Sequence, residues 1–269
     1  MNPRKFRNLV FKHYELHGRH DLPWRKTTDA YKILVSEVML QQTQVERVIP
    51  YYKKFLRQFP TVGVLAKAPL SDVLCAWQGL GYNRRAKMLY EAAKVVVRDY
   101  KGRMPLHAES LVLLPGVGSY TAQAVAAFAH NADGIFIETN IRTAVTHHFF
   151  SDRESVTDAE VLEILNEAYP KGRAREWYAA LMDYGSHLKR SGIRVNAKAK
   201  GYIKQSTFEG SNRQARGAIL RTLVRKPTTK RSLVSLLGKE RREQMETALQ
   251  ALIDEGVVVT SAGTASLAS

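Results

Sequence analysis

The sequence is poor in cysteine, in long apolar runs and in acidic side chains. Among its 269 residues there is one cysteine, Cys75, so the chain can form neither an internal disulfide nor a multi-cysteine metal or iron–sulfur site. No apolar run reaches the roughly 18 residues that a membrane-spanning helix needs. The charged N-terminus lacks the apolar stretch and cleavage site of a secretory signal. We therefore predict a cytoplasmic protein with no membrane partner.

The shortage of acidic residues leaves a formal net charge of +16 and an isoelectric point near 9.9. The excess of positive charge is concentrated between Lys171 and Arg242, a stretch that contains nineteen lysines and arginines but only four acidic residues. Such a stretch is typical of a protein that binds a polyanion. Nucleic acid is the first candidate, although ribosomal proteins and proteins of membrane surfaces share this signature.

Hydrophobic periodicity predicts an all-α architecture for most of the chain. The predicted helices span 30–48, 51–58, 70–78, 84–100, 108–113, 119–130, 141–149, 158–168 and 174–189. The basic, weakly periodic segment 191–213 is predicted to be a linker. After it, predicted helices at 211–225, 228–237 and 239–255 precede two short strands around Gly263. This order is typical of a winged helix, which binds either duplex DNA or another protein.

The segment Leu114-Pro115-Gly116-Val117-Gly118-Ser119-Tyr120-Thr121 is the most informative short motif. Its two glycines allow positive φ angles and expose backbone N–H groups, and a helix beginning at Ser119 adds the positive end of its dipole. We predict that residues 116–119 bind one DNA phosphate, and that the carbonyls of Leu114 and Val117 can hold a monovalent cation. The alternative is an ordinary corner between two helices.

Further blocks carry a resemblance to a known family. They are LPWR at 22–25, SEVMLQQTQV at 36–45, IPYY at 49–52 and GLGY at 79–82. With the glycine hairpin, they resemble the helix-hairpin-helix (HhH-GPD) DNA glycosylases over roughly residues 5–190, above all the adenine-DNA glycosylases of the MutY type. The resemblance implies a two-lobed fold, with one lobe from 1–22 and 132–209 and the other from 23–131. The active cleft would lie between the lobes, and 210–269 would form the winged-helix-like domain.

The function implied by this resemblance is base excision repair of double-stranded DNA that carries a mispaired or damaged base. We expect a monomeric, nucleoid-associated enzyme that removes adenine opposite 8-oxoguanine or guanine. Tyr120 stands where strand-cleaving relatives carry a lysine, and a tyrosine cannot form an imine, so a monofunctional enzyme is expected. One alternative is a thymine or uracil mismatch glycosylase, because the winged-helix candidate replaces the family's Nudix-like reader of 8-oxoguanine. The other is a DNA-binding protein without catalysis.

Two carboxylates match the needs of N-glycosidic cleavage, which requires an acid for the leaving base and an anion beside the sugar of a flipped nucleotide. Glu37 neighbours Ile33, Leu34 and Leu40 on its predicted helix, where burial would raise its pKa and keep it protonated. Alternatively, it lies on the solvated face of that helix. The resemblance implies that Glu37 is the catalytic acid.

The anion expected from the resemblance is Glu138. It precedes Thr139 and Asn140, which we expect to cap a helix beginning at Ile141, so the helix dipole should keep Glu138 ionised. The family has an aspartate here, so the extra methylene of glutamate is a departure from its pattern. This departure favours the alternative of a DNA-binding protein without catalysis. Tyr120 and Asn140 complete the predicted catalytic set.

Several polar residues match the positions with which the family distorts and grips DNA. Gln41 and Gln42 on the helix of Glu37, and Tyr82 in the GLGY loop, would wedge the duplex and fill the vacated space, with the ring of Tyr82 stacking on a base. Arg84 and Arg85 follow that loop. The family's four cysteines for a [4Fe–4S] cluster are missing after the segment that matches 177–185, so no cofactor is expected. The docking role of the cluster would pass to basic residues there: Lys189, Arg190, Arg194, Lys198 and Lys200.

Overall fold

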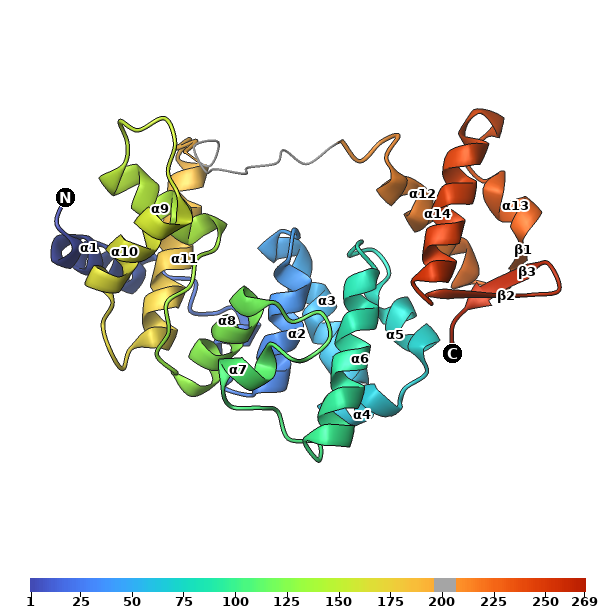
Figure 1. Ribbon diagram of the computed structural model, residues 1–269, viewed down its shortest axis with the longest axis horizontal. Coiled ribbons are helices and arrows are strands. Elements are labelled where there is room, and N and C mark those ends of the chain that lie inside the picture. The colour runs from blue at the N-terminus through green and yellow to red at the C-terminus, as the bar shows by residue number, and fades with distance from the viewer. Residues whose placement is uncertain (196–206) are drawn as a thin grey trace. The chain divides into compact units, whose positions relative to one another are not determined.

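The computed structural model describes residues 1–195 and 207–269 (Figure 1), so Lys198 and Lys200 of the predicted docking segment lie outside the described residues. The chain forms two compact units. Unit 1 comprises Met1–Glu37, Met104–Leu113 and Val117–Lys204, and unit 2 comprises Val38–Arg103, Leu114–Gly116 and Gln205–Ser269. The division into lobes inferred from the sequence stays a prediction. Within the described ranges, no helix is long and apolar enough to cross a membrane.

Unit 1 is a bundle of helices. Its elements are α1 (Pro3–His17), the 3-10 turn η1 (Pro23–Arg25), most of α2 (Ala30–Leu40), α7 (Ala108–Leu111), α8 (Ser119–His130), α9 (Thr139–Phe149), α10 (Asp158–Ala168) and α11 (Ala174–Arg190). Helix α11 packs against α1, α8 and α9, and α10 packs against α1 and α9 (Figure 1). Helix α11 supplies more residues to the buried core of this unit than any other helix.

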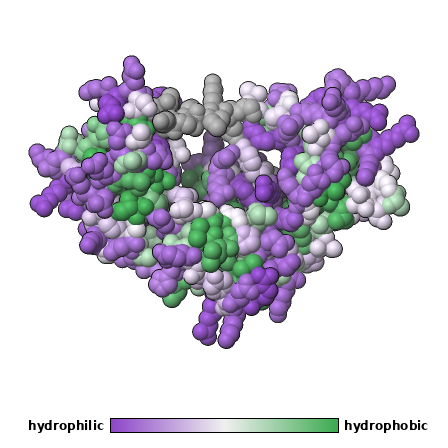
Figure 2. All heavy atoms as spheres, in the orientation of Figure 1, coloured by the Kyte–Doolittle hydropathy of each residue, from purple (hydrophilic) through white to green (hydrophobic). Residues whose placement is uncertain are grey.

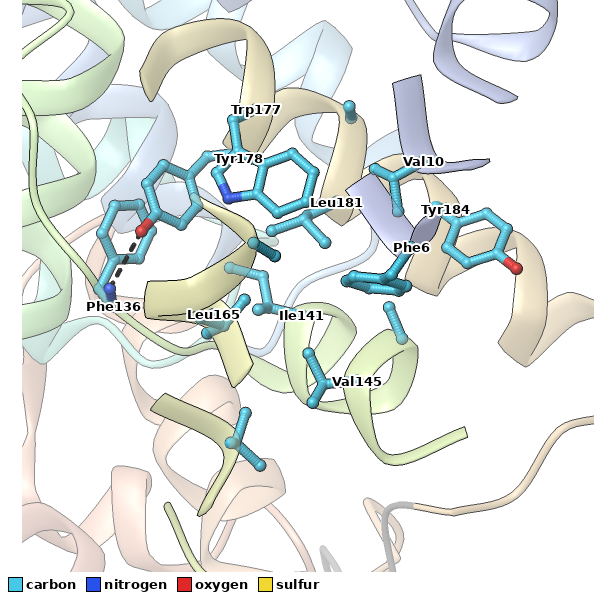
Figure 3. Packing of buried hydrophobic residues seen from close by; sticks show 14 of the residues in the cluster. Phe6, Val10, Phe136, Ile141, Val145, Leu165, Trp177, Tyr178, Leu181 and Tyr184 are labelled. Carbon is cyan, nitrogen blue, oxygen red and sulfur yellow. Dashed lines mark hydrogen bonds between the residues drawn. The ribbon is translucent and has the colours of Figure 1, made fainter. Parts of the chain in front are cut away.

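The core of unit 1 holds the chain segment that enters α9. Trp177 and Tyr178 of α11 are fully buried, together with Phe6 of α1 and Ile141 of α9 (Figure 3). The hydroxyl of Tyr178 donates to the carbonyl of Gly134 at 2.7 Å, and the backbone N–H of Phe136 donates to that hydroxyl at 3.2 Å. The extended segment before Glu138 is thus attached to α11.

Unit 2 contains α3 (Val45–Gln58), α4 (Val62–Lys67), α5 (Leu70–Trp77) and α6 (Arg84–Asp99). Its C-terminal part contains α12 (Asn212–Leu223), β1 (Thr228–Thr229), α13 (Lys230–Val234), η3 (Lys239–Arg241), α14 (Arg242–Asp254), β2 (Val258–Ser261) and β3 (Thr264–Leu267). The strands form an antiparallel sheet in the order β1-β3-β2. Neither α4 nor β1 was expected from the sequence, and the assignment of this part as a winged helix stays a prediction.

The predicted helix over 30–48 is wrong in its extent. The apolar stripe over 30–48 indicated a continuous helix, but α2 ends at Leu40 and α3 begins at Val45. Gln41 and Gln42 therefore lie in a turn, and Gln42 adopts a left-handed backbone with φ +56°. Long-range hydrogen bonds stabilise the break, because the guanidinium of Arg85 donates to the carbonyls of Val38 and Gln41 at 2.7 and 2.6 Å. Carbonyls at a helix end need such outside partners.

Candidate active site

Glu37 lies inside unit 1 rather than on a solvated face. Its side chain is 6 % exposed, and the hydroxyl of Tyr120 from α8 donates to its Oε2 at 3.0 Å. Burial raises the pKa of Glu37 to about 7, with a smaller contribution from the negative charge of Glu138, while the Tyr120 hydrogen bond acts in the opposite direction. The apolar position expected from the sequence is confirmed. A carboxyl group with this pKa can carry and release a proton near neutral pH.

Glu138 is the N-cap of α9, so the expectation that Thr139 and Asn140 would cap a helix from Ile141 is wrong. Its Oε1 accepts the backbone N–H groups of Asn140 at 2.7 Å and Ile141 at 2.9 Å. The side-chain amide of Asn140 donates to Oε2 at 3.1 Å. One oxygen of Glu138 thus accepts two of the N–H groups that the first turn of α9 leaves without a partner inside the helix.

The ionisation of Glu138 results from opposing influences. Burial raises its pKa, while the hydrogen bonds from Ile141 and Asn140 and the positive charge of Lys189 lower it. The pKa still lies above the ordinary value for glutamate, so burial has the larger effect. The helix dipole expected at this position is present, but ionisation of Glu138 at neutral pH stays a prediction.

Tyr120 connects the two carboxylates electrostatically. Its hydroxyl is bonded to Glu37, and its ring packs edge-on against Phe136 at 5.7 Å between centroids. Burial raises the pKa of Tyr120 well above its ordinary value, and the charges of Glu37 and Glu138 raise it further. Tyr120 therefore stays neutral and acts as a hydrogen-bond donor. The structure brings Glu37, Tyr120, Glu138 and Asn140 into one hydrogen-bonded and electrostatically coupled cluster within unit 1.

The glycine hairpin differs in one respect from the sequence prediction. Gly116 has a φ of +74°, and a Cβ there would lie 2.4 Å from the Cβ of Met88, so glycine is required. Gly118 does not have a positive φ: it is the extended N-cap of α8, with φ −81°. Gly116, Gly118 and Ser119 are exposed, whereas Val117 is buried. Phosphate binding by residues 116–119, and a cation at the carbonyls of Leu114 and Val117, stay predictions.

Leu113, just before this hairpin, was not singled out from the sequence, and it is 72 % exposed. The signal was the apolar run 111–114, in which Leu111 and Leu114 are buried while Val112 and Leu113 are exposed. Four consecutive apolar residues cannot all face the core from a single helical turn. Leu113 therefore adds an exposed apolar side chain to the predicted DNA-binding hairpin.

The predicted wedge residues are held in unit 2 by one arginine. Arg85 donates to the carbonyls of Met39 (2.9 Å) and Gly81 (3.2 Å) as well as to those at the end of α2. It thereby connects the turn that contains Gln42 to the loop that contains Tyr82, whose φ is +48°. Arg213 donates to the hydroxyl of Tyr82 at 3.1 Å. The contacts shown for Arg85 are with protein groups, and its binding to DNA stays a prediction, as does that of the exposed Arg84.

The basic residues at the end of α11 fall into two classes. Arg190 is exposed, whereas Lys189 is half-buried and acts electrostatically on Glu138. Burial lowers the pKa of Lys189, and the charge of Glu138 opposes that effect. DNA binding by both residues stays a prediction, and Lys189 has a second possible role inside the protein.

The donor set of the chain does not fit a [4Fe–4S] cluster. Its one cysteine, Cys75, lies in α5, and burial raises the pKa of that thiol, which disfavours the thiolate. Within the described ranges, no group of three or more histidine, cysteine or acidic side chains is arranged to hold a metal ion.

Comparison with known proteins assigns the family. The family model described as "HhH-GPD superfamily base excision DNA repair protein" matches residues 35–171. An adenine DNA glycosylase of Mycolicibacterium smegmatis is 35% identical over 265 residues, which cover 91% of this chain and 90% of the relative. The chain belongs to the HhH-GPD superfamily. It is accordingly a DNA N-glycosylase of base excision repair, and the alternative of a DNA-binding protein without catalysis is not supported.

Further relatives and solved structures differ in how much of their length this chain covers. An adenine DNA glycosylase of Buchnera aphidicola subsp. Baizongia pistaciae is 31% identical over 76% of this chain, which spans 60% of that relative. A thermostable thymine-DNA glycosylase structure has 28% identity and a TM-score of 0.60, covering 68% of this chain and 86% of its own. An endonuclease III–DNA complex, with 20% identity, a TM-score of 0.56 and coverage of 70% and 86%, shares the fold. The helical glycosylase fold expected from the sequence is thus confirmed.

Proposed function

We propose that this glycosylase removes adenine mispaired with 8-oxoguanine or guanine from double-stranded DNA, by hydrolysis alone. The observation that carries the proposal is the buried Glu37, whose pKa is raised to about 7 beside Tyr120 and Glu138. A protonated Glu37 would donate its proton to the leaving base, and an ionised Glu138 would stabilise the oxocarbenium-like sugar. The target nucleotide must first be flipped out of the duplex.

The adenine assignment is supported by relatives named adenine DNA glycosylase. A thymine or uracil mismatch substrate is the second candidate, because a thymine-DNA glycosylase structure is similar over 68% of this chain. Tyr120 supports a monofunctional reaction, since a phenol cannot form the imine that strand cleavage requires. We further propose a monomeric, nucleoid-associated enzyme of the cytoplasm that needs no cluster, because one cysteine cannot ligate one.

A panel of duplexes tests the substrate. It carries adenine, thymine, uracil or hypoxanthine opposite guanine or 8-oxoguanine, and single-turnover release of the base is measured. We expect fastest release of adenine, leaving abasic sites that break only after alkali or heat. Faster release of thymine or uracil would contradict the adenine assignment, and prompt strand cleavage trapped by borohydride would contradict the monofunctional one.

Replacement of Glu138 tests the anion. Glu138→Gln removes the charge in a similar volume, so single-turnover release of the best substrate should fall by about 10²-fold or more. Glu138→Asp keeps the charge with a shorter reach and should retain measurable turnover. If glutamine works as well as glutamate, Glu138 is not the anion. If aspartate is as inactive as glutamine, the site depends on the longer side chain.

A further inference from the structure

At Gly185, the backbone of helix α11 lies so close to the start of α9 that no side chain would fit between them. Gly185 is buried in α11, and a Cβ added to it would lie 2.0 Å from the carbonyl oxygen of Asn140. The carbonyl carbon and Cα of Asn140 would be 2.5 and 2.9 Å away. These are backbone atoms, so no side-chain rotation can relieve the overlap. The contact between α11 and residue 140 therefore requires a glycine.

The backbone that Gly185 touches belongs to the residue that holds the carboxylate of Glu138. Both the backbone N–H and the side-chain amide of Asn140 donate to Glu138, at 2.7 and 3.1 Å. A displacement of Asn140 would therefore move this carboxylate with it. Misplacing a reacting group by about 1 Å can cost a rate factor of about 10². The close approach of α11 thus determines where the negative charge lies.

One helical turn beyond Gly185, on the same face of α11, lies Lys189. Its positive charge lowers the pKa of Glu138, opposing burial. Among the described residues, Glu37 of α2 and Tyr120 of α8 are also coupled electrostatically to Glu138, and neither is a cation. Two residues on this face of α11 therefore act on the Glu138 carboxylate: Gly185 through its contact with Asn140, and Lys189 through its charge.

We propose that the face of α11 formed by Gly185 and Lys189 positions the catalytic anion: Gly185 determines where the Glu138 carboxylate is held, and the positive charge of Lys189 favours its ionised form. Both are positioning residues, since neither needs to touch the substrate. The inference rests on the proposed role of Glu138 and goes beyond it, because it explains how a buried glutamate N-cap can serve as an anion.

Replacement of Gly185 tests the geometric half. Gly185→Ala should lower single-turnover excision by about 10²-fold, with affinity for the uncleaved duplex within about threefold of wild type. Gly217→Ala is the matched control, because Gly217 also lies inside a helix, α12, and the nearest atom to its added Cβ is the flexible Nη1 of Arg221 at 3.4 Å. A wild-type rate in Gly185→Ala overturns the proposal. So does a Gly185→Ala protein that fails to fold, because the glycine would then serve the whole unit rather than the site.

Replacement of Lys189 tests the electrostatic half through the pH profile. The rate should rise with pH as Glu138 ionises, and loss of the nearby cation should raise the pKa of Glu138. Lys189→Met should therefore move this ascending limb to higher pH, whereas Lys189→Arg should leave it in its wild-type position. A lysine with a merely structural role would lower the rate at every pH without moving the limb, and that result would overturn the proposal.

Glu138→Gln, measured beside these variants, distinguishes the role of Glu138 as the anion from its positioning by Gly185 and Lys189. If Glu138→Gln keeps the wild-type rate, the proposed role of Glu138 itself fails. If Glu138→Gln is inactive while Gly185→Ala and Lys189→Met match the wild type in rate and pH profile, the anion assignment stands and only the positioning inference fails.

Discussion

Two buried carboxylates of unit 1, Glu37 and Asp183, have opposite pKa shifts. They are 6 % and 2 % exposed, so their burial is nearly equal. Glu37 accepts a hydrogen bond from the neutral Tyr120, and burial raises its pKa to about 7. Burial acts on Asp183 in the same direction, but hydrogen bonds and charges from Arg25 and Arg19 overcome it and lower the pKa. Burial raises the pKa of both carboxylates, and the partners of each one decide whether that effect survives and the group can act as an acid.

Asp183 has a structural role, because its hydrogen bonds join separate parts of unit 1. Both nitrogens at the end of the Arg25 guanidinium bond to Asp183, at 2.5 and 2.9 Å, and one also bonds to the carbonyl of Ala179. The backbone N–H of Arg19 donates to Asp183 as well, at 2.8 Å. These bonds connect η1 and the chain before it to α11. The lowered pKa favours a charged, structural Asp183 at neutral pH, whereas Glu37 can exchange a proton.

The largest effect on excision is expected for Glu37→Gln, which tests whether the buried Glu37, unlike Asp183, acts as an acid. The amide cannot donate a carboxyl proton, so single-turnover excision should fall by roughly 10²–10⁴-fold, the usual contribution of general acid catalysis. The matched control is Glu163→Gln, which alters an exposed glutamate of α10 and should leave the rate unchanged. Near wild-type excision by Glu37→Gln would mean that the raised pKa has no catalytic use.

Asp183→Asn should instead destabilise the fold and spare the chemistry. It leaves two arginines beside a neutral amide, which should lower the free energy of unfolding by about 3–5 kcal/mol at neutral pH. The measurement is urea denaturation. Asp99→Asn, in the exposed pair of Arg98 and Asp99, is the matched control and should leave the stability nearly unchanged. A specific loss of excision by folded Asp183→Asn would break the division between structural and catalytic carboxylates.

The pH dependence of this stability has a defined sign. The pKa of Asp183 is lowered in the folded state, so its contribution is present above the ordinary carboxyl pKa and is lost as the pH falls through the folded value. The stability difference between the wild type and Asp183→Asn should therefore shrink on acidification. An unchanged difference across that range would contradict the assigned charge of Asp183.

The smallest effect is expected for Tyr120→Phe. The lost hydrogen bond had favoured the ionised form of Glu37, so the pKa of Glu37 should rise above about 7. Since excision requires protonated Glu37, the descending limb of the pH–rate profile should move to higher pH. Single-turnover rates across the alkaline range measure this shift. A limb that moves to lower pH, or stays in place, would show that the tyrosine does not set the pKa of Glu37.

Local patterns predicted the family and most helices, but they failed where distant groups end a helix. The apolar stripe continues past residue 40, and nothing nearby in the sequence indicates that α2 stops there. The break depends on Arg85, which lies more than forty residues further along the chain. The start of α9 was misjudged for a different, local reason: Glu138 itself caps the helix, a role that Ser, Thr, Asp and Asn fill more often.

By itself, the sequence determined the helical class, the glycosylase resemblance, the lack of cysteines for a cluster and the identity of the two candidate carboxylates. These properties follow from composition, periodicity and short motifs, which are local. Only the tertiary structure decided that Glu37 is buried beside a neutral tyrosine, that Asp183 forms salt bridges with two arginines, and that Gly185 contacts Asn140. Protonation states and close backbone contacts depend on groups brought together from distant parts of the chain, and local spacing carries no information about them.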